Sequence, residues 1–200
     1  MRTMLCCLFT LSAITPAFAQ SLSQGDRDRA LSELHASRKQ FLDSVADLTE
    51  AQWNFKPAPE VWSIAECAEH ITLSEDLIMA LVRKTMASPA DPSKKEEVKG
   101  KDQKVLEGVV DRSQKFKAPE PLVPTHRWPT QQATIAEFKQ RRDRNLEYVR
   151  TTPDDLRSHF APHPVAGTLD AYQWILLLSA HSQRHTAQLN EVKQNPNFPK

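Results

Sequence analysis

The chain contains 200 residues, and its 40% hydrophobic and 26% charged residues are ordinary for a soluble globular domain. It has only four glycines and a formal net charge of +1, so glycine-rich phosphate loops and a strongly basic nucleic-acid-binding face are both disfavoured. No run of about 18 apolar residues occurs, so the sequence predicts no membrane span.

Residues 1–19 have the pattern of a secretory signal peptide. A basic residue precedes an apolar stretch over residues 4–14, and the small-x-small sequence that ends at Ala19 fits cleavage by signal peptidase. The alternative is an N-terminal core helix. We therefore expect export to the periplasm or the extracellular space, and a single domain over residues 20–200. This mature chain keeps one cysteine, Cys67, which cannot form an intramolecular disulfide.

Two long helices are predicted in the first half of the chain. Between residues 26 and 48, apolar residues recur at steps of three, four and seven and trace one helical face. A short helical turn at residues 49–53 and a proline-rich connection follow. Ser63-Ile64-Ala65-Glu66 is an S-x-x-E capping box, so we expect the second long helix from about Ser63 to Ala87.

The connection over residues 89–129 is expected to be irregular. It contains a charged stretch at residues 94–104 and then four prolines. A connection of this length is uncommon in a compact domain. Two arrangements stay open, namely a short helix around residues 105–110 and a segment that lies across the bundle as a cover.

Two further long helices complete the predicted fold. Thr130 is expected to cap the third, and the arginines at residues 141–144, Arg142 among them, are interpreted as its solvated face. Thr168 is expected to cap the fourth, whose apolar run at residues 174–178 makes it the most buried helix. No segment shows a convincing strand alternation. The sequence thus predicts an all-α four-helix bundle with a long connection between the second and third helices.

Three histidines have positions that suit a metal site. His181 and His185 are four residues apart on the fourth helix, so both project from the face that carries the apolar run. His70, two turns past the capping box, is the candidate for a third ligand. Three imidazoles from two helices form a triad that leaves coordination positions open for water or substrate. The alternatives are a surface pair or hydrogen-bonded core histidines.

Four other residues are weaker candidates near this site. Glu66, one turn before His70, is a candidate general base, although the capping box alone accounts for it. Cys67 is interpreted as a small buried hydrophobe, with a fourth ligand or a reactive thiol as the alternative. Gln188 is a candidate for orienting a ligand or substrate, and His163 is a candidate for approaching the site from the loop before the fourth helix.

Two motifs together, W-S-I-x-E-x-x-x-H over residues 62–70 and H-x-x-x-H over residues 181–185, make the chain resemble the DinB-like superfamily of metal-binding four-helix bundles. W-N-F-K-P at residues 53–57 adds to the resemblance, which spans residues 27–192. The resemblance implies that one divalent cation, typically zinc or nickel, is held by three side chains, His70, His181 and His185.

The resemblance also implies an activity, namely a metal-dependent hydrolase or a thiol-dependent transferase with an unidentified small-molecule substrate. The signal peptide argues against a cytosolic thiol as cosubstrate. A second possibility is a non-catalytic metal- or ligand-binding protein, or a stress protein, and a third is a bundle whose histidines bind no metal. Helical bundles expose apolar seams, so a homodimer also stays open. Neither a nucleic-acid partner nor a membrane span is expected.

Overall fold

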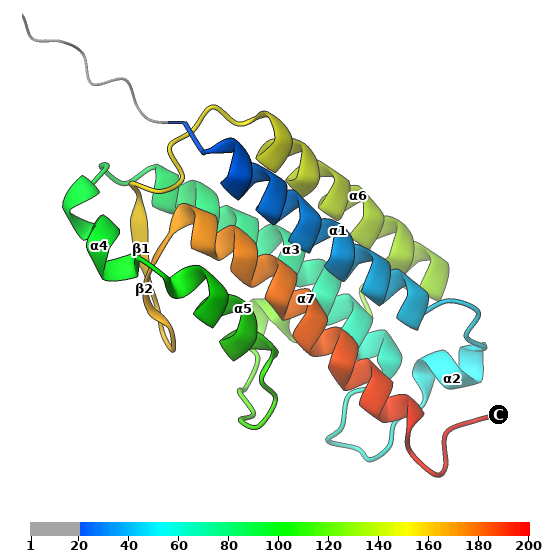
Figure 1. Ribbon diagram of the computed structural model, residues 1–200. Coiled ribbons are helices and arrows are strands. Elements are labelled where there is room, and N and C mark those ends of the chain that lie inside the picture. Colours follow the sequence, from blue (N-terminus) through cyan, green and yellow to red (C-terminus); the bar gives the residue numbers. More distant parts are fainter. Residues whose placement is uncertain (1–20) are drawn as a thin grey trace, which may run out of the picture.

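The computed structural model describes residues 21–200, so the predicted signal peptide lies outside the described residues. Four long helices run side by side (Figure 1) and confirm the predicted all-α bundle. Within residues 21–200, none of the helices combines the length and the apolar character that a bilayer crossing requires. The four helices are α1 (Gln24–Ser44), α3 (Ile64–Met86), α6 (Gln131–Thr151) and α7 (Ala171–Lys193).

The helices α1 and α7 are parallel neighbours. Near their start, the Tyr172 hydroxyl donates to the carbonyl oxygen of Asp26. Near their end, the Asn190 amide donates to the Ser44 hydroxyl. Both α1 and α3 pack against α6 and α7, so the first two long helices lie across a diagonal of the bundle. The apolar run at residues 174–178 of α7 is buried, as predicted.

Of the three side-chain caps predicted for the long helices, those of α3 and α6 are present and that of α7 is not. The Ser63 hydroxyl accepts from the Glu66 amide and the Glu66 carboxylate accepts from the Ser63 amide, which completes the capping box of α3. Thr130 caps α6 as expected. The predicted cap of the last helix was wrong, because Asp170 caps α7 and Thr168 lies in a strand. Thr49 caps a short helix, α2 (Glu50–Asn54), at the predicted helical turn.

A small antiparallel hairpin precedes α7 and was not predicted. Its strands are β1 (Phe160–His163) and β2 (Gly167–Asp170), with Phe160 opposite Asp170 and His163 opposite Gly167. Each strand has four residues, which is too short for the period of two to stand out. Gly167 has a φ of 70°, a conformation that glycine adopts without strain.

The long connection between α3 and α6 contains several short helices separated by irregular segments. The helix α5 begins earlier than predicted, packs against α7 (Figure 1) and buries Val105 and Leu106. Both arrangements left open by the sequence therefore hold, because a short helix forms and it also covers the bundle. The elements of the connection are η1 (Pro92–Lys94), α4 (Lys95–Val98), α5 (Lys101–Val110) and η2 (Glu120–Leu122).

A buried ion pair joins the four long helices. The Arg142 guanidinium of α6 donates to both carboxylate oxygens of Glu75 on α3, and neither side chain is accessible to solvent. It also donates to the hydroxyls of Ser37 on α1 and Ser182 on α7. The interpretation of Arg142 as part of a solvated face was therefore wrong. A periodic pattern cannot reveal a charged partner that lies on another helix.

Candidate metal centre

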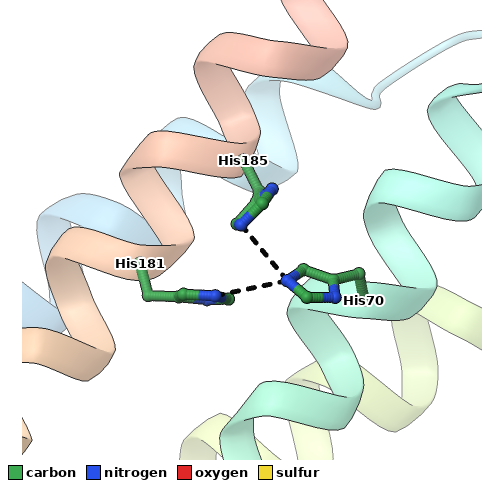
Figure 2. Close-up of side chains that lie close together, drawn as sticks. All are labelled: His70, His181 and His185. Carbon is green, nitrogen blue, oxygen red and sulfur yellow. Dashed lines mark hydrogen bonds between the residues drawn. The ribbon is translucent and has the colours of Figure 1, made fainter. Parts of the chain in front are cut away.

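Three imidazoles meet between α3 and α7. His70 projects from α3, while His181 and His185 project from successive turns of α7, and Figure 2 shows the three rings converging. The Nε2 atom of His70 lies 3.2 Å from Nε2 of His181 and 3.1 Å from Nε2 of His185. One ligand atom of each ring lies within 4.8 Å of the other two. The structure thus brings together the three histidines that the sequence spacing singled out.

The outer nitrogens of two rings show where their protons lie. Nδ1 of His70 is 2.8 Å from the carbonyl oxygen of Leu122, at the end of η2. Nδ1 of His185 is 2.8 Å from Oε1 of Gln188. Because these oxygens only accept, both Nδ1 atoms carry the proton and donate it. A neutral imidazole has one N–H group, so Nε2 of both these rings is unprotonated and has a free lone pair.

The contact between Nε2 of His70 and Nε2 of His185 therefore joins two hydrogen-bond acceptors. Two lone pairs at 3.1 Å repel each other unless a positive charge lies between them. Histidines that bind a metal use one ring nitrogen for the metal and donate the other N–H to an oxygen acceptor. The donor set and its outer hydrogen bonds consequently fit one divalent cation.

Burial keeps all three rings in the neutral form. It lowers the pKa of His70 despite the opposing hydrogen bond to Leu122. Burial, together with the nearby His185 and His70 rings, holds the pKa of His181 well below its usual value. Burial and the His70 ring lower the pKa of His185 to about 3. The neutral form is the one that binds metal, so a cation does not have to displace the additional proton of an imidazolium at neutral pH.

His181 lacks the outer hydrogen bond that the other two rings have. Its Nδ1 atom is buried and has no hydrogen-bond partner among residues 21–200. Packing places this ring instead, with its centroid 4.5 Å from that of His185 and 4.9 Å from that of His70. The site thus has two rings held by hydrogen bonds and one held by its neighbours.

Trp62 lies against the cluster, a position that was not predicted from the sequence. Its ring centroid is 5.0 Å from that of His70 and 6.3 Å from that of His185. Trp62 immediately precedes Ser63, the N-cap of α3. The start of this helix therefore places the indole on one side of the histidine rings. The W-S pair at the start of the first motif was the available signal. The indole thus packs beside two of the three imidazoles.

The Glu66 carboxylate is occupied by hydrogen bonds in the capping box and with Lys56. The Lys56 ammonium lies 2.6 and 2.8 Å from its two oxygens, and the Ser63 amide donates to Oε2 at 2.7 Å. Although burial opposes the effect, these hydrogen bonds and the Lys56 charge lower the pKa of Glu66. A carboxylate held in this way is a weaker base, and the catalytic role of Glu66 stays a prediction.

Two weaker candidates do not belong to the histidine cluster. Burial raises the pKa of the Cys67 thiol to about 12, so the thiol stays protonated at neutral pH and packs as a small hydrophobe. The His163 ring lies in the hairpin, 5.2 Å from the Trp174 ring, and its Nδ1 accepts from the amides of the turn.

The fold and the site together define a four-helix-bundle protein with a three-histidine candidate metal centre. A sequence profile of the DinB superfamily matches residues 33–189, a range that includes all three histidines. The chain therefore belongs to the DinB superfamily.

Two relatives from Bacillus subtilis are similar along most of the chain. The uncharacterized protein YuaE of strain 168 is 26% identical over 164 residues, which cover 82% of this chain and 97% of YuaE. The solved structure of YfiT, described as "a probable metal-dependent hydrolase with an unusual four-helix bundle topology", covers 90% of this chain and 93% of its own. The TM-score is 0.57 at 16% identity, a likeness that confirms the fold.

Proposed function

We propose that this protein is a hydrolase that depends on one divalent cation, bound by the imidazoles of His70, His181 and His185. The observation that carries the proposal is the 3.1 Å contact between two unprotonated nitrogens, Nε2 of His70 and Nε2 of His185. The relative YfiT is itself described as a probable metal-dependent hydrolase. Imidazole ligands suit zinc and nickel, and we propose one of these two metals.

A divalent cation supplies Lewis acidity, which makes water nucleophilic at neutral pH. The residues of the chain prepare the site for it. Burial keeps the three imidazoles in the neutral form. The Leu122 carbonyl and the Gln188 amide accept from Nδ1 of two rings and hold these rings in the ligating tautomer. The Trp62 indole covers one side of the rings.

We also propose that residues 1–19 direct export and are then removed. The proposal is supported by the apolar stretch and the small-x-small sequence at the start of the chain. Export separates the protein from cytosolic low-molecular-weight thiols. This separation favours water over a thiol as the nucleophile, and therefore a hydrolase over a transferase.

Metal content and turnover, measured together, test the proposed function. The mature protein, purified without a histidine tag, is analysed by mass spectrometry for bound metal and assayed on ester, amide and phosphoester substrates. His181→Ala is the site variant. His35→Ala is the matched control, because His35 is exposed on α1 and lies outside the cluster.

We expect one equivalent of metal and metal-dependent turnover in the wild type and in His35→Ala, and neither in His181→Ala. Bound metal without turnover on any substrate would replace the hydrolase with a metal-binding protein. Absence of metal in every sample, even after reconstitution with zinc or nickel, would overturn the metal centre itself.

A further inference from the structure

The structure assigns a positioning role to Arg112, which fixes the side-chain amide of Gln188 and, through it, the tautomer of His185. Arg112 lies just after α5, at the start of the loop that leads towards η2. The inference deepens the proposed function and rests on it for the effect on metal affinity. The tautomer itself can be measured without any metal.

The Arg112 guanidinium is held in place by Glu191 on α7. Its Nε and Nη2 atoms donate to the two carboxylate oxygens of Glu191, each at 2.7 Å. A bidentate pair of this kind fixes the plane of the guanidinium as well as its position. The third nitrogen, Nη1, then lies 3.4 Å from Oε1 of Gln188, one turn earlier on the same helix.

This contact determines how the Gln188 amide is oriented. A carboxamide can be rotated to exchange its oxygen and its NH₂ group, but a guanidinium can only donate. The atom that faces Arg112 is therefore the oxygen, because an NH₂ group there would place donors against donors. The same oxygen lies 2.8 Å from Nδ1 of His185. His185 must then donate from Nδ1, which leaves Nε2 unprotonated and free to bind a cation.

The loop that carries Arg112 is itself anchored on α7. The Arg184 guanidinium donates to the backbone carbonyl oxygens of Asp111 and Gln114 in this loop and of Val109 at the end of α5. The Arg112 side chain is only 20% exposed, so its contacts are less weakened by solvent than those of a surface arginine. Arg112 thus reaches the site from a segment that is held on α7 by three hydrogen bonds from Arg184.

The tautomer of His185 in the metal-free mature protein provides the first test. Long-range ¹H–¹⁵N correlation spectra at neutral pH distinguish a ring protonated at Nδ1 from one protonated at Nε2. The His185 signals are assigned by their absence from His185→Gln. We expect the Nδ1–H tautomer in the wild type and a substantial Nε2–H population in Arg112→Ala.

Three further variants separate positioning from a general structural effect. Arg112→Lys keeps a donor and should restore part of the Nδ1–H population. Glu191→Ala removes the anchor and should resemble Arg112→Ala. Arg38→Ala is the matched control, since the Arg38–Asp143 pair has side-chain exposures of 25% and 57% against 20% and 57% for Arg112–Glu191. This control should leave the His185 tautomer unchanged.

Zinc affinity, measured by competition with a chelator, is the second test. Loss of an outer partner of a histidine ligand typically weakens metal binding by about 10- to 100-fold, and we expect this for Gln188→Ala. Arg112→Ala should weaken binding by no more than that, and the double variant should be no weaker than Gln188→Ala. This is expected because Arg112 acts through Gln188.

The outcomes distinguish this inference from the proposed function. A wild-type tautomer in Arg112→Ala, or additive losses of affinity in the double variant, would overturn the role of Arg112. If neither the wild type nor any variant binds metal, the proposed function fails. The spectra of the metal-free proteins still decide whether Arg112 sets the tautomer of His185.

Discussion

Removal of one partner of the buried Arg142–Glu75 pair should destabilise the bundle strongly. The guanidinium has five N–H donors, and all are used: two by Glu75 and the others by the Leu34 carbonyl, the Ser37 hydroxyl and the Ser182 hydroxyl. Glu75→Leu leaves two of these donors unpaired and the positive charge without a counter-charge. We expect a loss of about 3–5 kcal/mol in the free energy of unfolding.

The double variant Arg142→Met, Glu75→Leu should be much more stable than the sum of its parts. The hydroxyls of Ser37 and Ser182 each also donate to a carbonyl oxygen of their own helix, so they stay satisfied without Arg142. The side-chain amide of Asn145 likewise retains a bond to the Glu75 backbone carbonyl. Replacing a buried ion pair by apolar side chains is often close to neutral for stability.

Urea unfolding of the metal-free protein, followed by circular dichroism, measures these free energies. Arg150→Ala is the control, because the Arg150–Glu147 pair is 63% and 57% exposed and should contribute at most about 1 kcal/mol. A loss of less than about 1 kcal/mol in Glu75→Leu or in Arg142→Met, or additive losses in the double variant, would contradict the predicted coupling of the two charges. Additivity would mean that the two charges do not depend on each other.

Other predictions concern acid sensitivity, the role of Glu66, the metal and the leader. The pKa of His185 in the folded protein, about 3, lies below its usual 6.5, so the unfolded chain binds a proton before the folded protein does. The free energy of unfolding of the metal-free protein should therefore fall as the pH drops from about 6.5 towards 3. His185→Gln should show a shallower fall in urea titrations. Glu66→Gln should keep its metal in mass spectrometry, and a wild-type turnover in this variant would dismiss Glu66 as the base. Chelation should lower the melting temperature of the wild type but leave that of His181→Ala unchanged in calorimetry. N-terminal sequencing of the exported protein should begin at Gln20, and an uncleaved chain would contradict the signal peptide.

The bundle and its three histidines could be predicted from the sequence because both depend on helical periodicity. The i, i+4 spacing of His181 and His185 places two imidazoles on one face whatever the rest of the chain does. The capping box that ends at Glu66 fixes the start of α3, and hence the face on which His70 projects. These features are local, so they can be recognised in the sequence without knowing which helix packs against which.

The predictions from the sequence were wrong where the role of a residue depends on another helix or strand. Arg142 was placed on a solvated face because its partner Glu75 lies on α3, and a charged residue on a helix is usually exposed. Thr168 was expected to cap α7 because the hairpin strands are too short to be recognised, and Asp170 does so instead. In both cases an ordinary local preference gave way to a tertiary contact.

The metal centre shows the same division between local and tertiary information. Its nitrogen donors lie on regular helices, α3 and α7, where spacing alone reveals them. Two of the contacts that orient these donors come from the irregular connection, namely the Leu122 carbonyl to His70 and Arg112 to Gln188. No periodic pattern predicts such contacts, because Arg112 lies in a loop and the three residues of η2 are too few to show a repeat. The long connection therefore contributes to the candidate site, since it helps to orient two of the three rings so that Nε2 faces the centre of the cluster.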